Sequence, residues 1–311
     1  MFKAHYSTYH VLLLIALLYA VFCNSLKAQT HSLETVLRTP EKVKQLHLSC
    51  DDLDAFDESA EKLTPLEALY IEDCELEQLP IEIAKLQNLT LLNVSGNHLK
   101  KLPEELGRLQ EIKVVNLRDN RFEYLPNVLL KMPHLREIDL AYNPQINWEV
   151  TTSILSRIEK LDFLYLDGNK IKTLQEELKH LKNLEELHLS SNPTLDLITA
   201  APILSQLPKL KILVLSNNKI SILPTEFKSL VQLNGLVLDN NPSIDFSTVL
   251  EFVENADELK VLLLRNNGLT KLPMDLSPLN KLKVLELSGN SFSESEKIRI
   301  RNVLGDTKVL F

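Results

Sequence analysis

The sequence lacks most of the signals that mark enzymes and nucleic-acid-binding proteins. Its 34 lysines and arginines are outnumbered by 42 acidic residues, which gives a formal charge of −8. A phosphate backbone requires a basic stripe, so we expect no nucleic-acid partner. The sequence contains no glycine-rich phosphate loop, no G-x-S-x-G nucleophile elbow and no H-E-x-x-H zinc motif. We therefore predict a protein that is not an enzyme and holds no cofactor or metal.

A hydrophobic run long enough to span a membrane is also missing. The apolar run from Val11 to Phe22 is shorter than the roughly 20 residues that a spanning helix needs. Lys3 precedes this run, and polar residues and the small Ala28 follow it. This arrangement predicts a secretory signal peptide over residues 1–28, with an uncleaved anchor as the alternative. The expected location is extracellular, or periplasmic and in the cell envelope.

The sequence is rich in one leucine phrase, L-x-x-L-x-L-x-x-N-x-L, which recurs eleven times. We number its residues as steps 1 to 11, so that in one copy Leu89 is step 1 and Asn97 is step 9. Successive copies begin 23 or 26 residues apart, at Val43, Leu66, Leu89, Ile112, Leu135, Leu161, Leu184, Leu210, Leu233, Leu259 and Leu282. A fixed period of this length predicts an α/β solenoid, a horseshoe of eleven repeats with a concave parallel β-sheet. Steps 3 to 7 should form the strand, and step 9 should turn the chain out of the sheet.

The repeats are of two lengths, which predicts two kinds of convex segment. Short units end on a Leu-Pro phrase, whereas the three long units carry Asn143, Asn192 and Asn241, each followed by proline. Three extra residues are close to one helical turn. We therefore expect α-helices in the long units, over residues 154–158, 203–207 and 252–256, and tighter turns in the short ones.

Both ends of the solenoid carry a predicted cap, because the outermost repeats need a polar cover. Residues 29–42 include a short helix with Leu33, Val36 and Leu37 on one side. The repeat domain spans residues 43–292. In the C-terminal cap, residues 293–311, Ser293 and Glu296 form a capping-box pattern before a helix to about residue 304 and a closing strand over residues 308–311.

The repeats resemble the leucine-rich-repeat family. The 23-residue unit with Leu-Pro, LTLLNVSGNHLKKLP over residues 89–103, is similar to the class found in Ras-signalling and scribble-type scaffold proteins. The entry segment SLETVLRTPEKVKQLHLS and the exit segment FSESEKIRIRNVLGDTKVLF resemble those of secreted bacterial repeat-only proteins. The resemblance implies protein binding through the concave face and supplies no catalytic residue.

Cysteine is scarce, since only Cys50 and Cys74 would remain after signal cleavage. They lie in adjacent repeats, so a disulfide is geometrically possible in an oxidising compartment. Cys74 takes the place of the step-9 asparagine and should point inward, while Cys50 lies one residue before the corresponding step. The sequence favours a small buried side chain and a free thiol over a bridge.

The outward-facing positions of the predicted strands form the candidate binding site for a protein or peptide. Its centre combines exposed aromatic, amide and acidic side chains, which are typical of interface anchors: Tyr70, Asn93, Asn116, Glu137, Asp139, Tyr142, Phe163, Tyr165, Asp167, Glu186 and His188. The acidic groups should select a basic partner. His188 beside Asp139 and Glu186 also resembles an acid–base or metal constellation, but an open sheet offers no water-excluding pocket.

A second, apolar part of this face is expected near the C-terminus, at Ile212, Val214, Val237, Val261 and Leu263, with Val284 beside them. Contiguous exposed apolar side chains mark interaction sites, although β-branched residues are also good strand formers. We therefore predict a non-catalytic binding module whose partner is basic and partly apolar. The alternatives are a structural protein that self-associates through the apolar strands, and an intracellular signalling scaffold if the N-terminal segment is not a cleaved signal.

Overall fold

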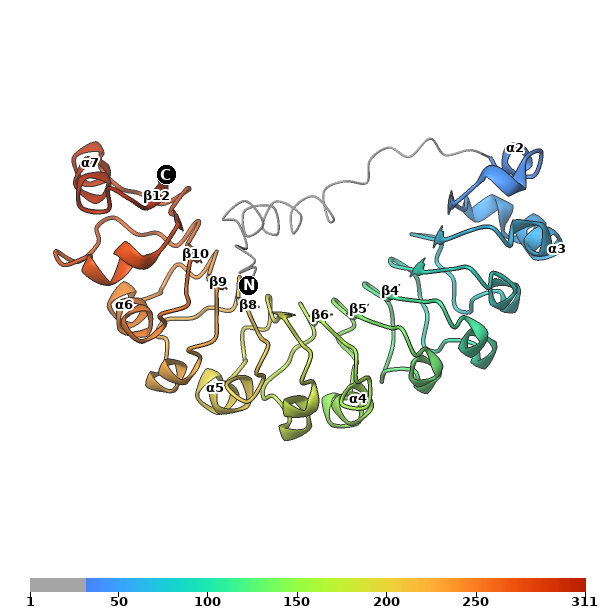
Figure 1. Cartoon of the computed structure of the whole chain (residues 1–311), viewed down its shortest axis with the longest axis horizontal. Coiled ribbons are helices and arrows are strands. Elements are labelled where there is room, and N and C mark those ends of the chain that lie inside the picture. The colour runs from blue at the N-terminus through green and yellow to red at the C-terminus, as the bar shows by residue number, and fades with distance from the viewer. Residues whose placement is uncertain (1–31) are drawn as a thin grey trace, which may run out of the picture.

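The computed structural model describes residues 32–311, so the predicted signal peptide lies outside the described residues. One parallel sheet contains twelve strands in the order of the sequence, from β1 to β12. The chain forms an arc in which the strands line the inner side and the helices the outer side (Figure 1). The predicted leucine-rich-repeat horseshoe with its concave parallel sheet is confirmed.

Each strand is only three residues long, and β1 to β11 occupy steps 3 to 5 of their repeats. The strands are Gln45–His47, Ala68–Tyr70, Leu91–Asn93, Val114–Asn116, Glu137–Asp139, Phe163–Tyr165, Glu186–His188, Ile212–Val214, Gly235–Val237, Val261–Leu263, Val284–Glu286 and Lys308–Leu310, for β1 to β12. The prediction of strands over steps 3 to 7 was too long. Beyond the strand, single backbone bonds still join the repeats, as from Val94 N to Asn116 O at 3.0 Å. The residue at step 8 has left-handed backbone geometry in units 2 to 11: Asp73, Gly96, Asp119, Tyr142, Gly168, Ser191, Asn217, Asn240, Asn266 and Gly289.

Equal strand lengths keep the repeats in register. Asp139, for example, pairs with Asn116 on one side and with Tyr165 on the other. Step 4 points into the core, and Leu92 and Leu164 at this step are completely buried. Steps 3 and 5 point to the opposite, concave face because side chains alternate along a strand. The predicted alternation of core and concave residues is therefore confirmed.

The step-9 asparagines join neighbouring repeats. All nine donate through Nδ2 to the step-6 carbonyl of the preceding repeat and accept at Oδ1 from a backbone N–H of that repeat. Asn169, which is 2 % exposed, bonds to Leu140 O at 2.9 Å and to Asn143 N at 2.6 Å. These bonds satisfy buried backbone groups that the short strands leave open.

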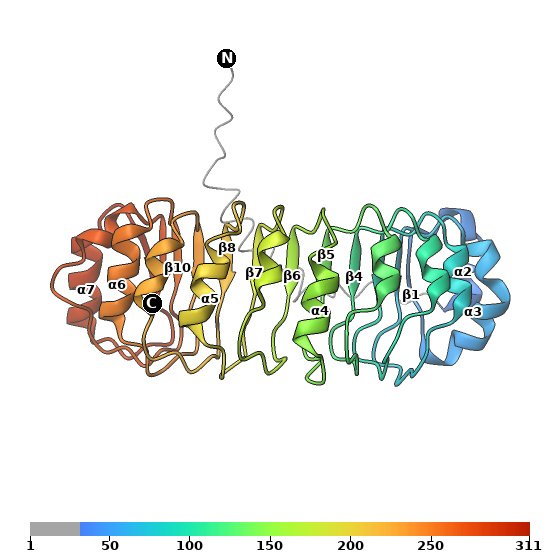
Figure 2. The same cartoon turned by 90° about the horizontal axis from the view of Figure 1, so that it is seen from below.

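The convex side carries α-helices in the long repeats and 3₁₀ helices in the short ones, as predicted. The α-helices α4 (Trp148–Leu155), α5 (Leu197–Leu204) and α6 (Phe246–Asn255) begin six residues before the expected ranges, because Asn147, Asp196 and Asp245 act as N-caps. The 3₁₀ helices of the short repeats are η4 (Ile81–Lys85), η5 (Glu104–Arg108), η6 (Asn127–Lys131), η7 (Glu176–His180), η8 (Thr225–Ser229) and η9 (Ser277–Lys281). Figure 2 shows the helices side by side along this face.

The first repeat departs from the others on its convex side. It contains η2 (Cys50–Asp52), α3 (Leu53–Ser59) and η3 (Ala60–Leu63), although it is a short unit. Before it, the cap comprises α2 (Leu33–Val36) and η1 (Pro40–Lys42). Leu33 and Val36 are buried against the core, as predicted.

The C-terminal cap consists of α7 (Glu294–Val303) and β12, close to the predicted helix and strand. Ser293 Oγ accepts from Glu296 N, which is one half of the expected capping box. The other half is absent. Glu296 instead accepts at Oε1 from Leu272 N at 2.9 Å and pairs with Arg299 at 2.7 Å, so this carboxylate ties the cap to the tenth repeat.

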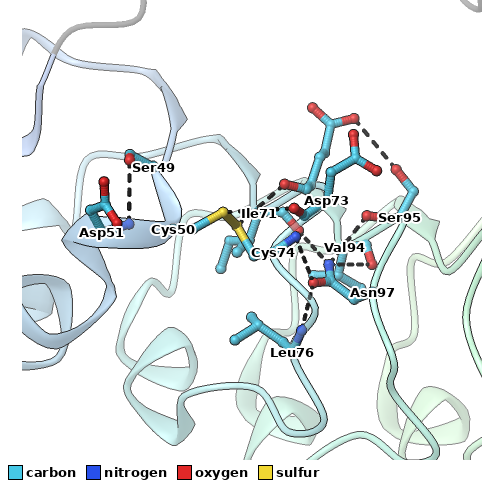
Figure 3. The surroundings of a disulfide bond; sticks show 11 residues. Ser49, Cys50, Asp51, Ile71, Asp73, Cys74, Leu76, Val94, Ser95 and Asn97 are labelled. Carbon is cyan, nitrogen blue, oxygen red and sulfur yellow. Dashed lines mark hydrogen bonds between the residues drawn. A yellow bond between two sulfur atoms is a disulfide. The ribbon is translucent and has the colours of Figure 1, made fainter.

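Cys50 and Cys74 form a disulfide, which overturns the preference for a free thiol (Figure 3). Neighbouring repeats bring their Cα atoms within 5.3 Å, inside the range that a disulfide spans. The disulfide joins the first and second repeats. Among the described repeats, this is the one junction whose second member lacks the step-9 asparagine, because Cys74 stands there. The disulfide therefore replaces the missing amide link. Closing a loop of this length is expected to stabilise the fold by about 3 kcal/mol.

Candidate functional site

The concave face is built from three rows of side chains, at steps 3, 5 and 7 of successive repeats. Parallel pairing aligns Glu137, Phe163 and Glu186 in the step-3 row and Asp139, Tyr165 and His188 in the step-5 row. Step 7 follows the strand and adds Asp167. We call the six polar residues of this region the central cluster: Glu137, Asp139, Tyr165, Asp167, Glu186 and His188.

Hydrogen bonds hold one side of the central cluster in place. His188 Nε2 lies 2.6 Å from Glu186 Oε1, and its Nδ1 lies 3.9 Å from Asp167 Oδ2. Asp167 also accepts from Ser190 N at 2.5 Å, and the rings of Tyr165 and His188 lie 4.5 Å apart. The imidazole is therefore fixed between two carboxylates and an aromatic ring.

Burial and mutual repulsion perturb the acids of the cluster. Burial, followed by the nearby charges of Asp139 and Glu186, raises the pKa of Glu137 to about 7. Burial likewise raises the pKa of Asp139 to about 6 and that of Asp167 above its usual value. The pKa of Tyr165 is raised by burial and by the surrounding carboxylates. The cluster therefore changes charge between about pH 5 and 8, well above the range of ordinary carboxylates.

Asp139 has an incomplete set of hydrogen bonds. Its Oδ1 accepts from Ala141 N at 2.8 Å, whereas its Oδ2 is buried and has no hydrogen-bond partner. Arg118 Nη1, at 4.0 Å from Oδ2, is the cation paired with it, and this distance is too long for a hydrogen bond. A buried acceptor without a donor costs free energy, so this oxygen requires an explanation.

Arg118 and Tyr142 form the rim above Asp139. The guanidinium carbon of Arg118 lies 4.5 Å from the centre of the Tyr142 ring, which is a cation–π contact. Tyr142 is 39 % exposed and has a φ of 55°, a conformation that is costly for a bulky residue. The same step is glycine in the next repeat, at Gly168. Tyrosine therefore stands where the backbone favours glycine.

The step-5 row continues from Asp139 toward the N-terminus through Asn116, Asn93 and Tyr70. Tyr70 stacks on His47 with ring centres 4.1 Å apart, and Asn93 donates to Glu72 at 2.7 Å. Asn116 Oδ1 accepts from Arg118 N at 2.9 Å. The predicted residues at step 5 therefore form one continuous row on the concave face, from Tyr70 to His188.

The predicted exposure of the C-terminal apolar residues is wrong. Val261, Leu263 and Val284 are 1, 5 and 5 % exposed and form a cluster of their own, apart from the main core. Val214 is also buried, while Ile212 and Val237 are half-buried. The reason is the in-register pairing, which places each apolar side chain against the equivalent one in the next repeat. We call this group the apolar strip: Ile212, Val214, Val237, Val261, Leu263 and Val284.

The sequence interpretation missed the charged residues at step 7. Arg118 belongs to this row, and so do Asp239 and Arg265, which form an ion pair with an Nη2–Oδ2 distance of 2.6 Å. Asp167 is at the same step and was predicted. Every step recurs on the same face, so following step 7 from repeat to repeat would have identified Arg118, Asp239 and Arg265.

Residues 32–311 contain neither a helix that could span a membrane nor a group of side chains that could hold a metal ion. No helix there has both the length and the apolar character that a membrane crossing needs. Across the same residues, no three histidine, cysteine, aspartate or glutamate side chains are grouped so as to hold a metal ion.

Similarity to known proteins is found in family models and in solved structures. A model described as "Leucine rich repeat" matches residues 87–144, and another with the same description matches residues 209–230. No curated protein sequence matches the chain significantly.

The similar solved structures include two that share the solenoid fold. An internalin from Listeria monocytogenes is 22 % identical with a TM-score of 0.57, over 81 % of this chain and 75 % of that one. Toll from Drosophila, in its complex with Spatzle, is 19 % identical with a TM-score of 0.60, over 86 % of this chain and 39 % of that one. A repeat protein from Leptospira interrogans is 25 % identical over 90 % of this chain and 98 % of that one, with a TM-score of 0.40. The repeats, the family models and the fold together identify this chain as a leucine-rich-repeat protein.

Proposed function

We propose that the protein is a non-catalytic binding module, exported from the cytoplasm, that holds a protein or peptide on its concave face. The observation that carries this proposal is the central cluster, where aromatic and acidic side chains are fixed on a sheet whose backbone is tied together by the asparagines. Rigid aromatic and charged groups at the centre of a surface are what binding hot spots consist of. The excess of carboxylates favours a basic partner.

Export is supported by the signal-peptide pattern and by the disulfide. Disulfides persist in extracellular and periplasmic compartments and are rare in the cytosol. An extracellular or cell-envelope location therefore agrees with both features. A cytoplasmic signalling scaffold would have to keep Cys50 and Cys74 reduced.

Burial within the apolar strip weakens the case for self-association. The prediction of self-association depended on exposed valine and leucine side chains, and most of these contact each other instead. Of the apolar strip and Phe163, the residues that stay half-buried and could contact a partly apolar partner are Ile212, Val237 and Phe163.

The experiment is capture of extracellular proteins by the immobilised chain, with identification of the captured protein by mass spectrometry. Tyr142→Gly with Phe163→Gln alters the concave face, and His180→Ala on the convex helix η7 is the matched control. Glycine suits the left-handed backbone at 142, so the double variant should stay folded. We expect the wild type and the control to capture one partner that the double variant loses. Equal capture by all three would contradict the concave site.

A further inference from the structure

Asp139 carries a charge that the fold does not require. In the two preceding repeats its position is occupied by Asn93 and Asn116, and their Oδ1 atoms accept from the N–H two residues later at 3.0 and 2.9 Å. Asp139 makes the same bond with Oδ1. An asparagine would therefore serve the backbone equally well, and the negative charge and the open Oδ2 remain unexplained.

The charged surroundings of Asp139 are predominantly negative. Two carboxylates act on it, Glu137 of its own strand and Asp167 just after β6, and Glu186 of β7 in turn acts on Glu137. The cations near Asp139 are Arg118 and, when protonated, His188. The Tyr165 hydroxyl completes the titratable groups of the cluster. Asp167 already accepts from Ser190 N, and Glu186 already contacts His188. Asp139 is the acid of the cluster that has a buried oxygen without a hydrogen-bond donor.

We propose that the central cluster binds an arginine side chain of the partner, with Asp139 Oδ2 as its direct acceptor and Glu137 beside it. This inference rests on the proposed function. Asp139 and Glu137 lie two residues apart on one strand face, and a guanidinium presents several donors in one plane that can bridge two such groups. The Arg118 side chain, whose Nη1 lies 4.0 Å from Oδ2, is 32 % exposed. Its long stem allows the guanidinium to move aside when the ligand enters.

Binding of a cation at this site is coupled to proton release. Burial raises the pKa of Glu137 to about 7 and of Asp139 to about 6, so at pH 5.5 both are largely protonated. An arginine stays charged throughout this range. Affinity therefore rises with pH and should increase at least tenfold between pH 5.5 and 7.5, because the ligand then meets carboxylates that are already ionised.

The experiment is selection of displayed random peptides on the intact chain at pH 7.5, followed by affinity measurements on synthetic copies of the selected peptides. Three comparisons accompany the wild type: Asp139→Asn, the control Glu286→Gln at the same repeat step outside the cluster, and each peptide with arginine replaced by lysine or glutamine. We expect arginine-containing peptides, at least tenfold weaker binding to Asp139→Asn, and no change in Glu286→Gln. The melting temperature of Asp139→Asn should not fall, which separates lost binding from lost structure.

The other outcomes overturn the inference in distinguishable ways. Peptides that lose binding to the Tyr142→Gly/Phe163→Gln variant but bind Asp139→Asn normally would refute the arginine site and leave the concave face as the binding surface. Equal affinity of the lysine form would refute recognition of a guanidinium. Peptides that bind all variants equally, or an absence of selected peptides, would refute both this inference and the proposed function.

Discussion

Apart from Asp167, the central cluster lies at the same steps of its repeats, 3 and 5, as the apolar strip does in the following repeats. The two groups nevertheless have opposite energetics. In the strip, in-register stacking buries Val261, Leu263 and Val284 against one another, and burial of apolar area is favourable. In the cluster, the same stacking buries Asp139 and crowds it against other acids, which is unfavourable. One half of the concave face therefore stabilises the solenoid, and the other half costs stability. A region that is costly to fold and easily replaced by neutral residues is a good candidate for function.

The largest effect should come from placing a charge in the apolar strip. Leu263→Glu would bury a carboxylate among valine side chains, and we expect the free energy of unfolding to fall by about 3 kcal/mol or more. Urea titration at pH 7.5 measures this change. If the variant were as stable as the wild type, the strip would be open to solvent and the comparison would fail.

Removing a charge from the central cluster should have the opposite sign. Asp139→Asn should raise the free energy of unfolding by about 1–3 kcal/mol at pH 8, because the raised pKa of Asp139 shows that the fold disfavours its ionised form. At pH 3 the side chain is protonated in both the folded and unfolded states, so the gain should vanish. Urea titrations at the two pH values test this, and a destabilised variant at pH 8 would show that the charge supports the fold.

The wild-type stability should itself depend on pH because of Glu137. Its pKa is about 7 in the folded protein, against an ordinary 4.5. The folded state therefore keeps a proton that the unfolded state releases between these values, and stability falls as pH rises through this window. The slope for one proton is at most about 1.4 kcal/mol per pH unit. Glu137→Gln should flatten the profile measured by thermal melting, and an unchanged profile would assign the slope to other groups.

The smallest expected change in stability comes from replacing one glycine in each region with alanine. Gly235 lies on β9 in the strip, where an added Cβ would meet only Ile212 Cγ1, at 3.7 Å. Gly235→Ala should stabilise the chain by about 0.5–1 kcal/mol by reducing the freedom of the unfolded state. Gly168→Ala beside the cluster should destabilise it, since φ is +68° and the Cβ would lie 2.6 Å from Tyr142 Cδ1. Thermal melting of both variants would show shifts of opposite sign.

Sequence reasoning succeeded where the repeat fixes the environment of a residue. Leu92, Leu164 and Asn169 recur at steps whose surroundings are the same in every unit, so their burial could be predicted from one copy. The helix starts were misplaced because Asn147, Asp196 and Asp245 cap the helices about two turns before the apolar residues that suggested them. Asparagine and aspartate are preferred N-cap residues, so the sequence already contained the signal for these helix starts.

The candidate site was predicted only as a set of outward-facing positions. The step-3 and step-5 rows on the concave face were correct, but exposure was not, since Tyr165 and Val214 are 6 and 9 % exposed. Exposure on a curved sheet depends on the sizes of the neighbours on both sides, and these come from repeats more than 20 residues away in the chain. The single-repeat pattern contains no such information.

By itself, the sequence determined the solenoid, its eleven repeats, its two caps and the direction of each strand side chain, because these follow from a local period that every unit restates. Only the tertiary structure decided which concave residues meet. Contact between repeats joined Cys50 to Cys74, closed the apolar strip and left Asp139 Oδ2 buried without a donor. The physical reason is that stacking brings residues of adjacent repeats to within about 5 Å, where size and charge, rather than periodicity, decide the energy.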